Sequence, residues 1–207
     1  MRTKVGAFAY TGAMNRARAH LLPLVLLTTT LAGCAGELPA AGDGAARAPV
    51  ALDVIFVASD LAIVKAMLTL ARVTRDDVVY DLGCGDGRIV ITAAREFGAR
   101  GVGVDLDPAR IREARAYAAR AGVGDRVTFR VQDLFETDIR DATVVALFLS
   151  PELNARLRPK LVSQLRPGSR IVSHRYGIGD WLPERSVTVS VNETRNHVFL
   201  WRVPERP

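Results

Sequence analysis

The chain has 207 residues, 49% of them hydrophobic and 24% charged, which excludes a disordered chain and allows one α/β domain plus an appendage. Two cysteines are too few for a disulfide-rich scaffold or a zinc site built from cysteines. The 28 basic and 22 acidic residues give a net charge of +6, which taken alone suggests a nucleic acid or an anionic membrane as partner.

The first feature along the chain is a targeting signal. Residues 14–35 read MNRARAHLLPLVLLTTTLAGCA, a basic stretch followed by an apolar run and then by small residues around Cys34. This is the order of a secretory signal peptide, and the run is shorter than the ~20 residues of a membrane-spanning helix. The segment Leu31-Ala32-Gly33-Cys34 resembles the lipobox of bacterial lipoproteins, whose cysteine is acylated. We therefore expect a signal peptide over 1–33, with Met14 as an alternative start, and a lipid on Cys34; an uncleaved hydrophobic anchor is the other interpretation.

Removal of this leader changes the charge. Residues 1–33 contain four basic residues and no acidic one, so 24 basic and 22 acidic residues remain. Residues 34–50 are rich in Gly, Ala and Pro without periodicity, which predicts a flexible tether. Residues 51–207 then form one domain with little net charge, for which we expect no nucleic-acid partner.

Helical and extended patterns alternate from about residue 59. Apolar residues recur at helical spacing from Leu61 to Ala71, with Ser59 or Asp60 placed to cap the start. Three more helices are expected after Gly87, from Pro108 and from Pro151, and Pro159 should break the last of them in two. The expected strands are 77–82, 101–104, 127–131, 143–149, 170–174, 186–191 and 197–203.

This alternation predicts an α/β fold. Strands separated by helices of 10–15 residues indicate right-handed βαβ units and a parallel sheet with helices on both faces. The last two strands are joined by a short link and have no helix of normal length before them. They should form an antiparallel hairpin at one edge of the sheet.

A glycine-rich loop follows the first strand. It reads D-L-G-C-G-D-G from Asp81 to Gly87, a G-x-G-x-G spacing that differs from the G-x-G-x-x-G of dinucleotide-binding folds. Carboxylates at Asp81 and Asp86 would repel a pyrophosphate but suit a cationic group. The second strand ends in Asp105, where an acid can accept ribose hydroxyls, and Asp133 follows the third strand at the height of an adenine ring. Together these residues predict a site for a nucleoside with a positive, amino-acid-like tail.

Three motifs in this order, D-L-G-C-G-D-G, G-V-G-V-D-L-D-P and V-Q-D-L-F, resemble those of class I S-adenosylmethionine-dependent methyltransferases. The resemblance implies a Rossmann-like, mostly parallel sheet of seven strands with an antiparallel last strand, and S-adenosylmethionine as cofactor. The resemblance implies that Asp81, Gly83 and Gly85 line the methionine moiety, that Asp105 and Leu106 lie at the ribose and adenine, and that Asp133 and Leu134 lie at the adenine amine. Asp86 and Gly87, in the same loop, are also expected to bind the cofactor.

A finer resemblance concerns the acceptor. The run D-V-V-Y-D-L-G-C-G-D-G-R-I-V and the later F-L-S-P are similar to membrane-associated protein lysine methyltransferases, related to the histone-lysine enzymes that lack a SET domain. Residues 56–60, F-V-A-S-D, differ from the aromatic-Val-Pro-Thr-Pro that is usual in that group. This resemblance implies a protein lysine as acceptor.

Fewer candidate residues can be assigned to the side of the site where the methyl acceptor would bind than to the cofactor side. The fourth and fifth strands should deliver Ser150, Glu152 and His174 to the carboxyl edge of the sheet, where such folds place the second substrate. His174 is a candidate base, but a histidine that only caps a strand end is an equally good interpretation, and Glu152 could simply favour a helix start. No metal is expected. Asp76 and Asp77 precede the first strand at the opposite edge and should be solvated.

Three functions are compatible with these features. The first is a methyltransferase acting on a protein lysine or another, small-molecule acceptor; the second is a non-catalytic nucleoside-binding lipoprotein of the cell envelope. A nicotinamide-dependent oxidoreductase is the third, which the glycine spacing and Asp86 disfavour. The signal predicts a membrane-anchored protein of the bacterial envelope, whereas S-adenosylmethionine is made in the cytoplasm, so the cytoplasmic face of the inner membrane is the alternative location.

Overall fold

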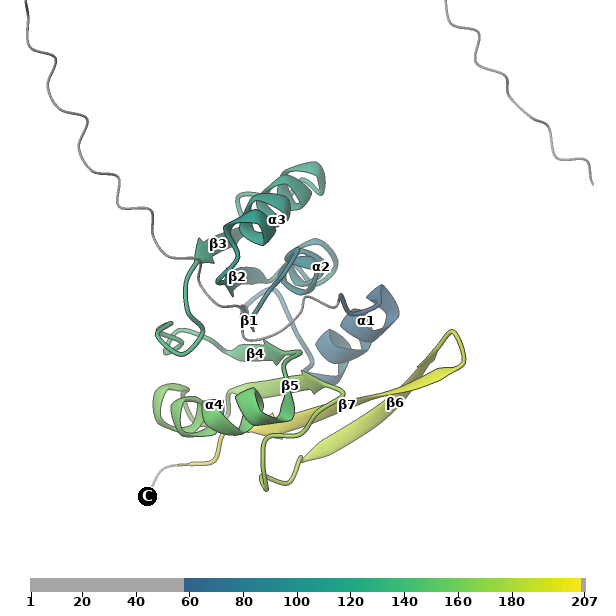
Figure 1. Cartoon of the computed structure of the whole chain (residues 1–207), viewed down its shortest axis with the longest axis vertical. Helices are drawn as coiled ribbons and strands as arrows, with labels where there is room; N and C mark the ends of the chain where they lie inside the picture. Colours follow the sequence, from purple (N-terminus) through teal and green to yellow (C-terminus); the bar gives the residue numbers. More distant parts are fainter. Residues whose placement is uncertain (1–57, 206–207) are drawn as a thin grey trace, which may run out of the picture. The chain divides into compact units, whose positions relative to one another are not determined.

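Seven strands form one sheet in the order β3-β2-β1-β4-β5-β7-β6 in the computed structural model, which describes residues 58–205 (Figure 1). The strands are β1 Val78–Leu82, β2 Arg100–Asp105, β3 Val127–Val131, β4 Val144–Leu147, β5 Arg170–His174, β6 Arg185–Val191 and β7 Thr194–Arg202. The helices are α1 Leu61–Leu70, α2 Arg88–Phe97, α3 Pro108–Arg120 and α4 Pro151–Gln164. The expected signal peptide, the lipidated Cys34 and the tether lie outside the described residues.

The topology confirms the predicted fold class. Strands β1 to β5 pair in parallel, β7 pairs antiparallel with β5, and β6 pairs antiparallel with β7 at the edge. Helices α1, α2 and α3 pack on one face and α4 on the other (Figure 1). None of the helices within residues 58–205 is long and apolar enough to span a membrane.

Strand β1 shows why the sheet is buried on both sides. Val79 packs among the residues of α1, α2 and α3, whereas Tyr80 and Leu82 pack among the leucines of α4. Successive side chains of a strand point to opposite faces, so apolar residues that alternate between the two faces require helices on both. The central strands are therefore rigid supports for the loops at their carboxyl ends.

Local signals explain where helix α3 begins and ends. The carboxylate of Asp107 accepts a hydrogen bond from the Ala109 amide at 2.7 Å, and Pro108 occupies the first turn, where its missing N–H is not needed. Beyond the helix, Gly122 has a φ of +68°. The start at Pro108 is the one predicted from the sequence, and Asp107 and Gly122 supply the cap and the stop.

Helix α4 corrects one expectation. It runs without a break from Pro151 to Gln164, although Pro159 lies inside it. A proline removes the amide that would bond to the carbonyl four residues earlier, here that of Ala155. Both Pro159 and Ala155 are exposed, so water can solvate this carbonyl and the helix continues. Leu61 corrects another, since it is 49% exposed at the first position of α1 and not part of its buried face.

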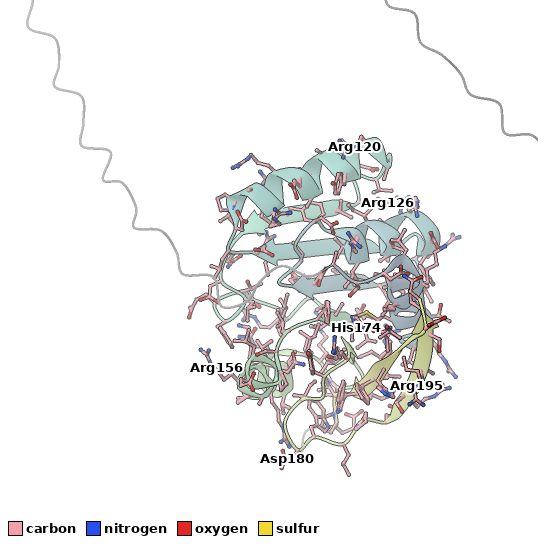
Figure 2. The ribbon with its side chains drawn as sticks, turned by 45° about the vertical axis from the view of Figure 1, so that its right-hand side comes forward. Arg120, Arg126, Arg156, His174, Asp180 and Arg195 are labelled. Carbon is pink, nitrogen blue, oxygen red and sulfur yellow. The ribbon has the colours of Figure 1, made fainter. Side chains whose placement is uncertain are left out.

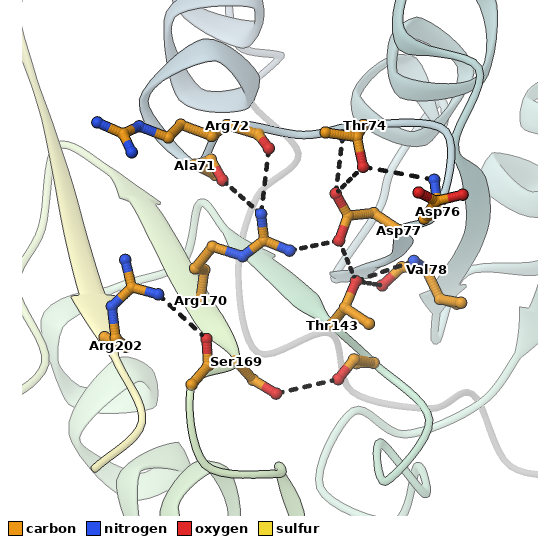
Figure 3. Close-up of polar contacts among 12 residues, drawn as sticks. Ala71, Arg72, Thr74, Asp76, Asp77, Val78, Thr143, Ser169, Arg170 and Arg202 are labelled. Atoms are coloured by element: carbon orange, nitrogen blue, oxygen red, sulfur yellow. Dashed lines mark hydrogen bonds and ion pairs between the residues drawn. The ribbon is translucent and has the colours of Figure 1, made fainter.

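Asp77, which we expected to be solvated, is buried at the amino edge of the sheet (Figure 3). Its carboxylate accepts hydrogen bonds from the Thr74 amide at 2.7 Å and the Thr143 hydroxyl at 2.6 Å, and it forms an ion pair with Arg170. Arg170 also donates to the carbonyl oxygen of Ala71 at 2.8 Å. This network fastens the loop between α1 and β1 to strands β4 and β5.

Candidate active site

The candidate site lies at the carboxyl ends of β1 and β2. The chain passes from β1 through α2 to β2 on one side, and β4 pairs with β1 on the other, so the strand order reverses at β1. In open α/β sheets, ligands bind outside the carboxyl ends of the strands at such a reversal. The glycine-rich loop, Asp105 and the start of α4 all lie at this edge.

The glycine-rich loop has a conformation that its sequence permits. Gly83, Gly85 and Gly87 have φ values of +85°, +51° and +76°, a region that side chains with a Cβ seldom adopt. The amides of Gly83 and Cys84 both donate to the carbonyl oxygen of Val104, at 2.9 and 2.8 Å. These bonds hold the loop against the end of β2.

Gly87 is required for a second reason. A Cβ at this position would lie 2.5 Å from a ring carbon of Phe129 and 3.0 Å from the Cβ of Ala114. The start of α2 therefore approaches β3 and α3 more closely than any side chain would allow. The glycines of this motif thus give the loop both its curvature and its tight packing.

Asp81 is a buried carboxylate without a hydrogen-bond donor among residues 58–205. Its side chain belongs to a residue only 2% exposed at the end of β1. Burial raises the pKa of Asp81 to about 8, and the neighbouring carboxylates of Asp105 and Asp86 act in the same direction. A cation bound beside Asp81 would supply both the missing donor and the missing countercharge.

Asp105 is held in a defined orientation by the backbone. One of its carboxylate oxygens accepts from the Gly85 amide at 2.8 Å, and the other accepts from the Asp107 amide at 2.9 Å. Each oxygen keeps a second lone pair, which can accept a hydroxyl of a ribose. The next residue, Leu106, is half-buried beside it.

Asp133 and Leu134 lie in the turn after β3. One oxygen of Asp133 accepts from the Phe135 amide at 2.7 Å, and Thr137 donates its hydroxyl to the Asp133 carbonyl at 2.8 Å. Leu134 is half-buried against the cluster on the α4 face. The turn is thus fixed next to β2, because the Gln132 amide donates to the carbonyl of Asp105 at 3.0 Å.

Asp86 has a different partner from the cationic ligand expected for it. Its two oxygens accept from Nε and Nη2 of Arg88 at 2.9 and 2.6 Å, a bidentate ion pair in which both side chains are largely buried. Arg88 also donates from Nη1 to the carbonyl oxygen of Ser59 at 2.6 Å. Direct contact of Asp86 with a ligand stays a prediction, since the structure shows it as an acceptor for Arg88.

The expected acceptor residues differ in their surroundings. Ser150 caps α4 by accepting from the Leu153 amide at 3.3 Å, and it is half-buried. Glu152 is exposed in the first turn of α4, where its own backbone amide and the Ser150 side chain lower its pKa. A carboxylate that holds its proton so weakly is a poor acid and a poor base near neutral pH.

His174 ends β5 as a buried residue, 4% exposed (Figure 2). Nδ1 lies 2.9 Å from the Ser59 hydroxyl and Nε2 lies 3.2 Å from the amide oxygen of Asn196. Burial lowers the pKa of His174, which outweighs the opposite effect of Asn196, and Arg175 lowers it further. With both nitrogens engaged, His174 could act as a base only by breaking one of these bonds, so that role stays a prediction.

Residues 58–205 hold no group of three or more His, Cys, Asp or Glu side chains arranged to bind a metal ion. Cys84 is buried, and burial raises the pKa of its thiol far above its usual value. This thiol therefore stays protonated and unreactive.

Sequence reasoning missed Ser59, Arg88 and Asn196 as parts of this edge. Arg88 had a local signal, because it follows Asp86 by two residues. The contacts of Ser59 and Asn196 with His174 had none, because 115 and 22 residues separate the partners.

Comparison with known proteins decides what this site does. The family model described as the ANTKMT methyltransferase domain matches residues 81–185, about half of the chain. The chain belongs to this methyltransferase family. A protein-lysine N-methyltransferase of Saccharolobus islandicus (strain REY15A) is 44% identical over 144 residues, covering 69% of this chain and 89% of that protein. The adenine nucleotide translocase lysine N-methyltransferase of Mus musculus is 38% identical over 141 residues, covering 68% of this chain and 61% of the mouse enzyme.

A solved structure supports the cofactor. The RNA methyltransferase from Salinibacter ruber, crystallised with S-adenosyl-L-homocysteine, is 50% identical, with a TM-score of 0.68 over 73% of this chain and 96% of that one. The methyltransferase described here thus spans nearly all of the archaeal and Salinibacter proteins, but less than two thirds of the mouse enzyme.

The methyltransferase therefore uses S-adenosylmethionine, and this function prevails over the non-catalytic and nicotinamide-dependent alternatives. The site fits the cofactor: Asp81 is a buried carboxylate to which residues 58–205 offer no cation, Asp105 is an oriented acceptor, and the loop between them carries no Cβ at its three glycines.

Proposed function

We propose that the methyltransferase methylates the side-chain amine of protein lysines. The observation that carries the proposal is its similarity to the archaeal protein-lysine enzyme along nearly all of that enzyme's length. The mouse lysine enzyme supports it through a similar share of this chain.

The cofactor supplies a methyl group on a positively charged sulfur. In the proposed assignment, Asp81 binds its ammonium group, Asp105 accepts from its ribose hydroxyls, and Asp133 and the Leu134 backbone contact its adenine. Asp81 is the most selective of these, because a buried carboxylate pairs with an ammonium group but would repel the pyrophosphate of a dinucleotide. These roles define where the acceptor must approach, which is the carboxyl edge of β4 and β5.

This edge has aromatic character. Phe148, directly after β4, and Tyr176, two residues after β5, are both half-buried. Aromatic faces suit a lysine, whose unbranched stem is apolar and whose ammonium is attracted to a ring. We propose that Phe148 and Tyr176 border the path of the acceptor and that Ser150 lies beside its end.

A lysine must lose its proton before it can attack the methyl group. Among the described residues at this edge, Glu152 is exposed with a lowered pKa, and His174 has both nitrogens engaged. We propose that the proton leaves to water and that alignment of the amine, together with its desolvation, supplies most of the catalysis. Ser150 and Glu152 then orient the acceptor without accepting its proton.

RNA is the second candidate acceptor, because the solved methyltransferase from Salinibacter ruber that is 50% identical is described as an RNA methyltransferase. The near-neutral charge of residues 34–207 favours protein over RNA, since binding to phosphates depends on an excess of Lys and Arg.

The experiment that separates the two acceptors is methyl transfer from tritiated S-adenosylmethionine by the full-length protein. The acceptors are membrane and soluble fractions of cells in which its gene is deleted. We expect label that protease releases and that acid hydrolysis yields as methylated lysine. Label released only by ribonuclease would identify RNA as acceptor and overturn the lysine proposal.

We also propose that Cys34 anchors the protein to a membrane through a lipid. The basic and apolar leader and the lipobox-like segment support this. Radiolabelled palmitate should enter the wild-type protein and be absent from Cys34→Ser; label that survives the substitution would contradict the anchor. Protease treatment of intact spheroplasts then distinguishes an exported domain from one that faces the cytoplasm, where the cofactor is made.

A further inference from the structure

One set of hydrogen bonds joins four separate parts of the chain at the carboxyl edge of the sheet. We call it the His174 network: Asp86, Arg88, Ser59, His174 and Asn196. Asp86 belongs to the glycine-rich loop, Ser59 lies just before α1, and Asn196 belongs to the β6–β7 hairpin. Its members are far apart in sequence and are brought together only by the fold.

The chemistry of its acceptors defines the state of His174. The amide oxygen of Asn196 can only accept, so Nε2 of His174 must carry a proton and donate to it. In a neutral imidazole, Nδ1 is then an acceptor and receives the Ser59 hydroxyl. Burial lowers the pKa of His174, in agreement with a neutral ring. His174 thus holds Ser59 on one side and the hairpin on the other.

The link from Ser59 to the cofactor loop runs through its carbonyl oxygen. Arg88 donates to this oxygen at 2.6 Å while it forms the bidentate ion pair with Asp86. Asp86 lies between Gly85 and Gly87, and Gly85 donates its amide to Asp105. A shift of Ser59 would therefore move Arg88, and with it the loop that carries Asp86.

On its other side, His174 connects to the β6–β7 hairpin, near the edge where we propose that the acceptor approaches. Val198 of β7 pairs with His174 at the end of β5, so residues 194–197 extend past that end. The Arg175 amide donates to the carbonyl oxygen of His197 at 2.7 Å, which closes this extension onto β5. The ring of Phe148 lies against the ring of His174, with centroids 4.1 Å apart. His174 thus contacts the residue that we propose to border the acceptor.

We propose that His174 is a positioning residue for methyl transfer, which through Ser59 and Arg88 holds the glycine-rich loop in its cofactor-binding arrangement. This role needs no proton transfer by His174. It also holds whichever acceptor is methylated, so its failure would leave the lysine proposal intact.

The test is a double-mutant cycle on cofactor-site affinity in the full-length protein, with S-adenosylhomocysteine as the probe. Ser59→Ala removes the hydroxyl, and His174→Phe keeps a ring against Phe148 but removes both hydrogen bonds. The matched control is His197→Phe, since His197 is an exposed histidine on the same hairpin with a comparable bond to the Thr188 hydroxyl. Calorimetry gives the Kd, and hydrogen exchange reports on the amides of residues 83–88.

We expect each single variant to weaken binding by about tenfold, the effect of one well-formed hydrogen bond. The double variant should bind as weakly as either single variant and no more so, because both changes break the same link. Amides of residues 83–88 should exchange faster in all three, and His197→Phe should stay within about twofold of wild type.

Two results would overturn the proposal. One is a Kd unchanged by Ser59→Ala although the melting temperature falls, which would show a merely structural bond. The other is a double variant whose loss is the product of the two single losses. Should His174→Phe fail to fold, Ser59→Ala alone decides, through its Kd and the exchange of the loop.

Discussion

At the scale of single residues, the burial of Asp81 lowers the stability of the free protein once the pH is high enough to ionise its carboxyl group. Its folded-state pKa of about 8, against a reference of 3.8, means that the free protein keeps this carboxyl protonated while the unfolded chain ionises it. Stability from this group is therefore complete below about pH 4 and is lost as the pH rises to about 8. In the proposed cofactor site, the ammonium group of the cofactor would offset this cost when it binds beside the carboxylate.

Asp81→Asn tests this role of Asp81. We expect the melting temperature of the variant, relative to wild type, to rise between pH 5 and pH 8, because the amide has no proton to lose. S-adenosylhomocysteine should bind about tenfold to a hundredfold more weakly, as when a charged hydrogen bond is removed. Thermal melts with and without ligand measure both effects, with the exposed Asp76→Asn as control. Unchanged affinity would remove Asp81 from the site.

Gly87 is the position at which the addition of a single methyl group should cause the largest local loss of stability. Gly87→Ala combines a positive φ with a contact of 2.5 Å to Phe129, for which we expect a loss of about 2–4 kcal/mol in unfolding free energy. Urea denaturation measures it against two controls. Gly122→Ala has a positive φ in open space and should lose about 1 kcal/mol, and Gly124→Ala, without either constraint, should be near neutral. Equal losses at all three would refute the packing explanation.

Contiguous residues of the site could be predicted from the sequence, and distant ones could not. Strands β1 and β2 have clear apolar patterns. Since Asp81 and Asp105 lie at their carboxyl ends and the glycine-rich loop follows β1, their position at one common edge was predictable. The burial of Asp77 was not, because Arg170 and Thr143 come to it from strands that are distant in sequence. For the same reason, the partners of His174 became visible only in the folded chain.

At the scale of elements, the Asp77 network should carry stability without function. Burial alone would raise the pKa of Asp77, but bonds from Thr143 and Thr74 and the charge of Arg170 outweigh it and lower the pKa. The network therefore stabilises above the unfolded pKa of 3.8, and its contribution falls as the pH falls through the lower folded pKa.

Arg170→Met leaves Asp77 as a buried charge without its cation, for which we expect a loss of about 3 kcal/mol at neutral pH. Arg202→Met is the control, because its ion pair with Glu184 is exposed and should contribute less than about 1 kcal/mol. Chemical denaturation measures both. Since the network lies at the edge opposite the cofactor, a parallel loss of S-adenosylhomocysteine affinity in the folded Arg170→Met would contradict this separation.

The β6–β7 turn is an element that the sequence predicted only coarsely. The expected strands left residues 192–196 as the link between them. In the structure, β7 begins at Thr194 and the turn consists of Asn192 and Glu193 alone, with φ values of +46° and +64°. Two such residues match the twist of a hairpin, and glycine is favoured at the second. The side chain of Glu193 gave no sequence signal for this conformation.

Glu193→Gly should therefore stabilise the protein by about 0.5–1 kcal/mol, because it removes the strain of a positive φ. Thr188→Gly, in the extended part of β6, is the control and should destabilise by a similar amount. A fall in the melting temperature of Glu193→Gly, like that expected for the control, would show that the turn is not strained.

At the scale of the whole molecule, the apparent basicity of the chain belongs largely to residues 1–33, which contain four basic residues and no acidic one. Residues 58–205 form an α/β sheet, and we propose that its carboxyl edge combines the cofactor site with the aromatic acceptor side. Its topology was predictable because every strand and helix has a continuous pattern. The acceptor was indicated only by a resemblance, because Phe148 and Tyr176, which we propose border its path, lie in separate segments and only Phe148 belongs to a motif, F-L-S-P.

The most direct test of the account is a calorimetric titration of the full-length methyltransferase with S-adenosylhomocysteine, repeated on Asp105→Ala and with NAD as a competing ligand. We expect a single site for the sulfur nucleoside, a loss of at least about tenfold in affinity on removal of Asp105, and no binding of NAD. Failure of the wild-type protein to bind S-adenosylhomocysteine, or an affinity unchanged by Asp105→Ala, would contradict the cofactor site described for this fold.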